Sequence, residues 1–245
     1  MIDLSEKVVL ITGAGSGLGA AIARAFGSHG SRVVCLDIRR EAAEEVASSL
    51  RSDGVAAIAL ECNVAEEHSV AACVDRALEE HGSVDIAVSC AAIDHTLAVA
   101  EMSVEQWDAV IGVNLRGPFL VSRAVLPTMR ARGYGHIVNI ASTAATRAWA
   151  NASAYHASKW GLVGFSRGLG VEGREHGIRV TTVIPGGMRT HFFDRFEELG
   201  IPMPLEENLQ DPANVAEVVI TACRLPRDSA LQEVIVTPVT ETSWP

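Results

Sequence analysis

Short apolar runs alternate with longer amphipathic stretches along the 245 residues of the chain. The first run, Lys7–Thr12, is almost continuously apolar and stops at glycines, which is typical of a strand buried on both faces. The next segment, Gly17–Ser28, repeats apolar residues at spacings of three and four and predicts a helix. The same alternation predicts six further strands, at Arg32–Asp37, Ala56–Glu61, Asp85–Ser89, His136–Ile140, Arg179–Ile184 and Glu233–Thr237.

Helical patterns separate these strands. They cover about Arg40–Ser52, Glu66–His81, Val104–Gly112, Gly117–Arg130, Ser153–His176 and Ala213–Cys223. We expect the third and fourth of them to be separate helices, with a break at Gly117–Pro118. Because strands that alternate with helices form βαβ units, we predict an α/β fold: a Rossmann-like, doubly wound, seven-stranded parallel sheet with helices on both faces. No linker or repeat interrupts the pattern, so residues 1–245 are predicted to form a single domain.

The stretch at 188–210 departs from this pattern. It follows the sixth strand and carries two prolines and three phenylalanines. Ligands of open α/β sheets bind beyond the carboxyl ends of the strands. The stretch therefore predicts a lid over a substrate pocket, with a plain surface excursion as the alternative. Its candidate pocket side chains are Arg189, His191, Phe192, Phe193, Arg195, Phe196 and Met203.

Charge and composition exclude several classes of partner. The net charge of −10 disfavours binding to nucleic acids, whose phosphates an acidic surface repels. No run of about 18 apolar residues is free of charge, so we expect no membrane-spanning helix. The first residues lack the basic and apolar regions of a signal peptide, which favours a cytoplasmic location. Histidines and cysteines are not spaced as metal ligands, and no metal site is predicted.

A glycine-rich turn, Thr12-Gly13-Ala14-Gly15-Ser16-Gly17-Leu18-Gly19, joins the first strand to the first helix. Glycines let a phosphate approach the backbone, and free N–H groups at a helix start attract an anion. Eighteen residues after Gly19, the second strand ends at Asp37. A carboxylate there can accept hydrogen bonds from both ribose hydroxyls of an adenosine and repels a 2′-phosphate. The turn predicts a dinucleotide site, and Asp37 favours NAD over NADP.

Tyr155 and Lys159 lie four residues apart in the longest helical pattern and therefore share one helix face. A phenol has an ordinary pKa near 10, and lowering it to about 7 requires roughly 4 kcal/mol. An ammonium about 4 Å away supplies an interaction of that order at an effective dielectric of about 20. Ser142 ends the fifth strand, where its hydroxyl can hold a substrate oxygen. The alternatives are an amphipathic surface pair and a serine in a local turn.

Together these residues resemble the short-chain dehydrogenase/reductase family, in its compact single-domain branch, from Lys7 to about Ile235. The glycine turn T-G-x-x-x-G-x-G of the family is matched by Thr12, Gly13, Gly17 and Gly19. The Asn-Ser-Tyr-Lys tetrad of the family is matched by Asn114, Ser142, Tyr155 and Lys159, and its P-G-x-x-x-T segment by Pro185, Gly186 and Thr190.

The resemblance implies hydride transfer between a nicotinamide cofactor and a secondary alcohol or ketone, with Tyr155 as proton donor and acceptor. Lys159 would lower the tyrosine pKa and bind the nicotinamide ribose, Ser142 would hold the substrate oxygen, and Asn114 would hold a water that relays protons. The implied cofactor-binding residues are Gly13, Ser16, Gly17, Leu18, Gly19, Asp37, Ile38, Asn63, Val64, Ala91, Tyr155, Lys159, Pro185, Gly186, Met188 and Thr190. A homo-oligomer, tetramer or dimer, is also implied.

Two segments depart from the family pattern. Ser89-Cys90-Ala91-Ala92 stands where N-N-A-G is usual, which removes amides that tie neighbouring strands. The tail at 237–245 lacks the usual glycine-rich finish. Alternative functions are a non-catalytic dinucleotide-binding sensor or scaffold, an NADPH-dependent ketoacyl-type reductase, and a sugar-nucleotide epimerase or dehydratase. The substrate stays open among steroids, sugars, polyols, acyl thioesters and antibiotic intermediates, with Trp149 and His95 as further candidate pocket residues.

Overall fold

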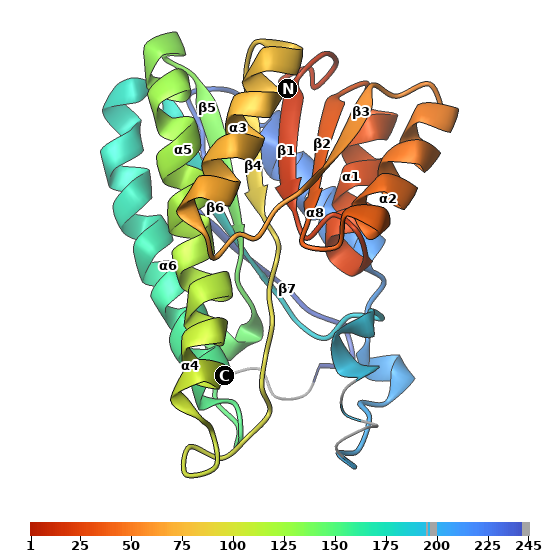
Figure 1. Ribbon diagram of the computed structural model, residues 1–245, viewed down its shortest axis with the longest axis vertical. Coiled ribbons are helices and arrows are strands. Elements are labelled where there is room, and N and C mark those ends of the chain that lie inside the picture. Colours follow the sequence, from red (N-terminus) through yellow and green to blue (C-terminus); the bar gives the residue numbers. More distant parts are fainter. Residues whose placement is uncertain (195, 197–199, 242–245) are drawn as a thin grey trace.

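The computed structural model describes residues 1–194, 196 and 200–241 (Figure 1). One seven-stranded sheet has the order β3-β2-β1-β4-β5-β6-β7, and every pairing is parallel. The strands are β1 (Val8–Thr12), β2 (Arg32–Asp37), β3 (Ala57–Glu61), β4 (Ile86–Ser89), β5 (Gly135–Ile140), β6 (Ile178–Pro185) and β7 (Glu233–Val236). The predicted seven-stranded parallel sheet is confirmed.

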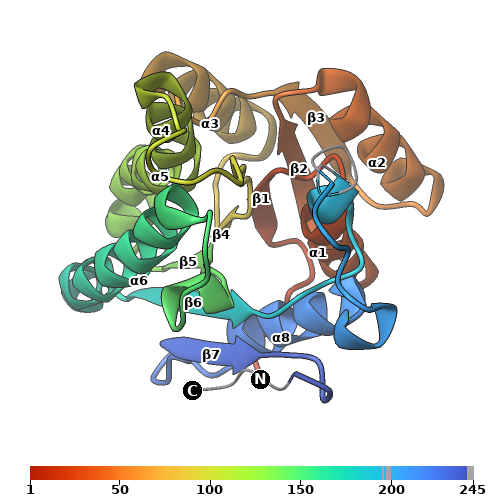
Figure 2. The same cartoon turned by 90° about the horizontal axis from the view of Figure 1, so that it is seen from below.

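Helices cover both faces of the sheet. They are α1 (Gly17–Ser28), α2 (Arg40–Ser52), α3 (Glu67–His81), α4 (Val104–Ile111), α5 (Gly117–Arg132), α6 (Ser153–Gly173) and α8 (Pro212–Arg224). One face carries α1, α2 and α8, and the other carries α3, α5 and α6 (Figure 2). In β1, Val9 and Ile11 pack into the first layer, while Val8 and Leu10 pack into the second. This two-sided burial explains why the strand is an almost continuous apolar run.

The break expected at Gly117–Pro118 is wrong. A π-helical turn, Gly112–Arg116, joins α4 to α5, and 104–132 is one continuous helix of 29 residues. The widened turn accommodates Pro118, which has no N–H to donate to the helix. The helix is long and apolar enough to cross a membrane. Buried core helices of soluble proteins share these properties, so its length and composition are weak evidence of a membrane span. The absence of a membrane segment therefore stays a prediction.

The chain order in the sheet locates the ligand-binding edge. From β1 the chain winds outward through β2 and β3, and it then returns to the other side of β1 to build β4 through β7. A crevice forms at such a switch point, beyond the carboxyl ends of the strands. In Figure 1 these ends point downward, toward the segments at 90–103, 141–152 and 186–210. Residues that are far apart in sequence therefore meet below β1 and β4.

Candidate active site

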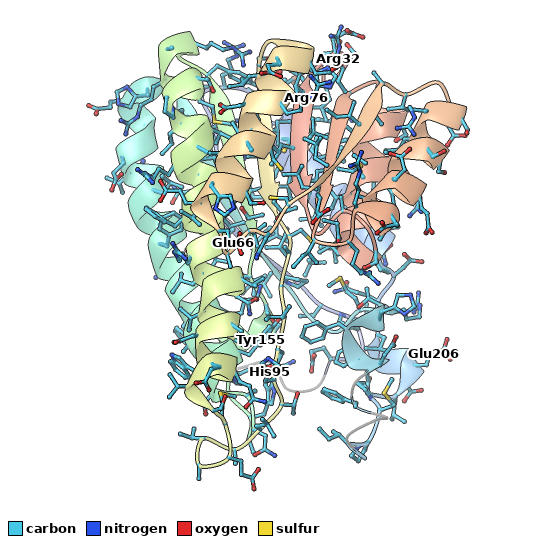
Figure 3. All side chains as sticks on the ribbon, viewed as in Figure 1. Arg32, Glu66, Arg76, His95, Tyr155 and Glu206 are labelled. Carbon is cyan, nitrogen blue, oxygen red and sulfur yellow. The ribbon has the colours of Figure 1, made fainter. Side chains whose placement is uncertain are left out.

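A cleft of about 790 Å³ lies at this edge of the sheet. Every residue predicted to be catalytic or cofactor-binding lines the cleft, except Asn114, which is buried. In Figure 3, Tyr155 lies below the sheet, and Glu206 of the 188–210 segment lies to its right. Trp149 also lines the cleft, whereas His95 is not part of the lining. The sequence motifs are thus brought together, while their chemical roles stay predictions.

The glycine turn shapes one end of the cleft. Gly13 has a φ of +68°, a backbone conformation that favours glycine. A Cβ on Gly19 would lie 2.0 Å from the Gly13 carbonyl oxygen, so only glycine fits there without a shift. Ser16 precedes α1, and among the described residues its side chain makes no capping bond to the helix. The N–H groups at the start of α1 are therefore available to a phosphate.

Gly19→Ala is expected to lower the free energy of unfolding by about 1–3 kcal/mol and to weaken dinucleotide binding, because the added methyl must displace the turn. Gly164→Ala is the matched control, since a Cβ at this exposed position of α6 meets no atom within 4 Å among the described residues. That control should raise the free energy of unfolding by about 0.5–1 kcal/mol. Urea unfolding and NADH fluorescence titration measure both effects. Equal behaviour of the two variants would contradict the tight turn.

The carboxylate of Asp37, at the end of β2, forms the adenosine end of the predicted site. It accepts hydrogen bonds from the backbone N–H groups of Gly15 and Arg39, both at 3.0 Å. These bonds fix its orientation, and each oxygen keeps a further lone pair for a ribose hydroxyl. Asn63 is held locally, because its side-chain carbonyl accepts from Ala65 N–H at 3.1 Å. The Asn63 side chain thus shapes the turn after β3 at the edge of the cleft.

Tyr155, Lys159 and Ser142 line the cleft beyond the carboxyl end of β5. The Lys159 Nζ lies 5.5 Å from the Tyr155 ring centroid and donates a 2.9 Å hydrogen bond to the carbonyl of Ile140. Burial lowers the pKa of Lys159 to about 8. The Ser142 Oγ accepts a hydrogen bond from the Ala144 N–H at 3.1 Å, so Ser142 does make the local turn bond that the sequence suggested as an alternative. This bond leaves the hydroxyl proton of Ser142 to be donated elsewhere.

Asn114 lies in the π-helical turn behind the cleft and is only 1% exposed. Its side-chain amide accepts from the Ile93 N–H at 2.9 Å and donates to the Ile93 carbonyl at 2.8 Å. It also donates to the Ser158 Oγ at 3.1 Å. Asn114 thus ties the segment after β4 to α6, next to Lys159. Its implied role in holding a relay water stays a prediction.

The two ends of the 188–210 segment are hydrogen-bonded to each other. Met188 pairs with Gln210, and the Gln210 N–H donates to the Gly187 carbonyl at 3.0 Å. Phe192 contacts Tyr155 with 5.5 Å between ring centroids, and Phe193 and Phe196 continue this row of aromatic rings along the cleft. Arg189 and Met203 line a neighbouring pocket against α1 and α8, and Arg195 lies outside the described residues. The opening and closing of a lid stays a prediction.

A search of protein-family models matches residues 7–198 to the short chain dehydrogenase family. The chain is a short-chain dehydrogenase. It is 42% identical over 182 residues to D-threitol dehydrogenase of Mycolicibacterium smegmatis, covering 74% of this chain and 70% of the relative.

Solved structures show the same relationship. A metagenomic short-chain oxidoreductase in complex with NADP is 33% identical, with a TM-score of 0.85 and coverage of 98% of this chain and 100% of that one. A short-chain dehydrogenase/reductase from Burkholderia phymatum in complex with NAD is 26% identical, with a TM-score of 0.86 and coverage of 96% and 90%. This short-chain dehydrogenase is therefore an NAD(P)-dependent oxidoreductase, as the sequence motifs indicated.

At Ser89-Cys90-Ala91-Ala92, the segment that departs from the family pattern, backbone groups tie β4 to β1 in this short-chain dehydrogenase. The Ser89 Oγ is buried and has no hydrogen-bond partner among the described residues. The Thr12 Oγ1 accepts from the N–H groups of Cys90 at 3.0 Å and Ala91 at 3.2 Å. One hydroxyl therefore holds the end of β4 against the glycine turn.

Sequence reasoning missed three charged residues that line the cleft of the dehydrogenase: Asp94, Arg147 and Glu241. Arg147 follows the predicted Ser142 closely in a strand-end loop, which is a signal that could have identified it. Glu241 belongs to the tail whose role was left open, and its sequence context carries no such signal. No group of three histidine, cysteine, aspartate or glutamate side chains that could hold a metal occurs in the part of the chain that the structure describes.

Proposed function

We propose that this short-chain dehydrogenase uses NAD to oxidise a neutral secondary alcohol that carries further hydroxyl groups. The observation that carries the proposal is the placement of Tyr155, Lys159 and Ser142 on one cleft with the glycine turn and Asp37. The cleft lining also includes the polar residues Asn151 and Asn208, which suit a hydroxyl-bearing substrate. Its 42% identity to a D-threitol dehydrogenase supports a polyol or diol over a wholly apolar alcohol.

The residues present suit a bound NAD. The first turn of α1 would hold its phosphates, the Asp37 carboxylate its adenosine ribose, and Lys159 its nicotinamide ribose. When bound, the nicotinamide would accept the hydride from the carbinol carbon. Asp37 carries the preference for NAD, because its carboxylate would face the 2′-phosphate of NADP and repel it.

Side chains of the cleft would accept the proton that leaves the substrate hydroxyl. The Ser142 hydroxyl would donate a hydrogen bond to the substrate oxygen, and the Tyr155 phenolate would take the alcohol proton at its Oη. The Lys159 Nζ lies 5.5 Å from the Tyr155 ring centroid, and a unit charge at about that distance from the phenolate would favour it by roughly 3 kcal/mol at an effective dielectric of about 20. The bond from Lys159 to the Ile140 carbonyl fixes the ammonium, so little reorganisation accompanies each transfer.

We further propose that the enzyme is a cytoplasmic homo-oligomer, a tetramer or dimer. Large apolar side chains on the outer faces of α4, α5 and α6 are well exposed, which supports contact with another subunit: Trp107, Phe119, Trp160 and Val171. Cysteines without disulfides among the described residues support a reducing compartment. Light scattering of the purified chain tests the oligomeric state.

A substrate panel tests the proposed function. The purified enzyme is given NAD or NADP with diols, polyols, hydroxy acids and steroid alcohols, and formation of the reduced cofactor is followed by absorbance. We expect turnover with NAD, fastest on neutral diols or polyols. Dinucleotide binding without turnover across the panel would instead indicate a sensor or scaffold, and faster NADPH-dependent reduction of a ketoacyl thioester would indicate the reductase alternative.

A further inference from the structure

Two missed residues, Arg147 and Glu241, form an ion pair in the cleft wall. The Arg147 Nη2 lies 2.7 Å from the Glu241 Oε2, and the two side chains are 19% and 15% exposed. Arg147 comes from the loop after β5, whereas Glu241 follows β7, 94 positions later in the sequence. Because both side chains are largely shielded from water, their charges interact more strongly than those of a surface pair.

The loop after β5 holds the Arg147 guanidinium close to the predicted reaction centre. Its Nη2 lies 3.4 Å from the Thr143 Oγ1, and Thr143 directly follows Ser142. The guanidinium also lies 5.9 Å from the Trp149 ring centroid. His156 holds Trp149 in turn: its Nε2 accepts a hydrogen bond from the backbone N–H of Trp149 at 3.1 Å, and the two rings lie 4.5 Å apart between centroids. Arg147 is therefore a positioned cation.

The C-terminal segment brings Glu241 to this cation. The Glu241 N–H donates to the Pro238 carbonyl at 3.0 Å, which turns the chain after β7. The neighbouring Thr240 Oγ1 donates to the Glu207 carbonyl at 2.6 Å, which ties the tail to the 188–210 segment. The ion pair and the Thr240 hydrogen bond together thus join three segments that line the cleft: the loop after β5, the tail and the 188–210 segment.

The charges on this wall bear on which substrates the cleft accepts. Arg147, Glu241 and Asp94 all line the cleft together with Ser142 and Tyr155. An arginine beside a substrate is a strong partner for a carboxylate or phosphate, since its fork of N–H donors matches their oxygens. Here the Glu241 carboxylate already engages the guanidinium at 2.7 Å. An anionic substrate would have to displace the Glu241 carboxylate from Arg147 and would then lie close to it.

We propose that Glu241 determines the charge of the substrate. By neutralising Arg147, it makes the cleft accept neutral, hydroxyl-bearing alcohols and reject alcohols that carry a carboxylate. The inference rests on the proposed dehydrogenase function and deepens it, because it assigns the tail a part in the substrate site.

The test compares two secondary alcohols of similar size, neutral 2,3-butanediol and anionic 3-hydroxybutyrate, with saturating NAD. In the wild-type enzyme we expect kcat/KM for the diol to exceed that for the hydroxy acid. Glu241→Gln should shift this ratio toward the acid by about 10-fold or more, mainly through a lower KM for the acid, because a charge-assisted hydrogen bond becomes available. Removing the cation as well, in the double variant Glu241→Gln with Arg147→Met, should abolish the shift.

Two matched variants control for charge and folding. Glu172→Gln makes the same charge change at an exposed position of α6 and should leave the ratio as in the wild type. Glu241→Asp retains the carboxylate and should retain the preference for the diol. An unchanged ratio in Glu241→Gln would overturn the proposal.

A second readout does not need turnover. Butyrate should raise the melting temperature of the NADH-bound Glu241→Gln enzyme more than that of the wild type. If no alcohol is oxidised but butyrate still distinguishes the two proteins, the proposed function fails while the charge role of Glu241 stands. Equal stabilisation of both proteins would argue against that role.

Discussion

Tyr155→Phe is expected to lower kcat/KM for alcohol oxidation by at least about 10²-fold and by as much as about 10⁴-fold. The substitution removes the oxygen that we propose exchanges the alcohol proton, and it leaves the rest of the ring against Phe192. Binding of NADH should change little, because the glycine turn and Asp37 are untouched. Steady-state kinetics and fluorescence titration of NADH separate the two effects.

The chain supplies a matched control for this substitution, because it has two tyrosines. Tyr134 is also buried, does not line the cleft, and has a hydroxyl without a hydrogen-bond partner among the described residues. Tyr134→Phe should therefore retain wild-type activity and nearly wild-type stability. Full activity in Tyr155→Phe would show that the phenol is not the proton acceptor.

Asp37→Ser is expected to shift the preference between cofactors by about 10²–10³-fold toward NADP, measured as the ratio of the two kcat/KM values. The substitution removes a charged acceptor for the ribose hydroxyls and relieves the repulsion of a 2′-phosphate. Arg39, which also lines the cleft, then becomes available to pair with that phosphate. The two N–H groups donate to different oxygens of Asp37, so the single serine hydroxyl can replace the acceptor of either Gly15 or Arg39.

Asp75→Ser, at an exposed position of α3, removes the same charge away from the cleft and should leave the cofactor ratio unchanged. A wild-type enzyme that prefers NADP would contradict the assignment of Asp37. So would a ratio in Asp37→Ser that equals the wild-type ratio.

The sequence predicted the bounds of helices and strands well where nearby residues mark the ends of the element. The bounds of α1, β2 and α2 agree with prediction, because the glycine turn, Gly30 and the residues around Asp37 mark their ends. The joined α4–α5 helix could not be predicted in this way. Its π-helical turn contains Asn114, which is bonded to the backbone of Ile93 from another segment. Tertiary contacts accompany the turn, and the local Gly-Pro pair suggested a break instead.

The residues of the candidate site also differ in whether local sequence or long-range packing brings them together. Tyr155 and Lys159 are one helical turn apart, so their proximity follows from local geometry. Arg147 and Glu241 are 94 positions apart, and each is an ordinary charged residue in its own segment. Glu241 lines the cleft through long-range contacts, with its own ion pair to Arg147 and the bond from Thr240 to the Glu207 carbonyl. Sequence patterns therefore identified the aromatic side chains of the 188–210 segment that line the cleft, but not the charged pair that we propose acts on the substrate.

The hydrogen bonds from Cys90 and Ala91 to Thr12 have a consequence for how the enzyme is made. They span 78 and 79 positions, so the glycine turn lacks these ties until more than a third of the polypeptide has left the ribosome. Contacts of such long sequence separation are slow to form. An amino-terminal fragment that ends before β4 would lack this support, and nucleotide affinity in a truncation series should emerge only once that strand is included.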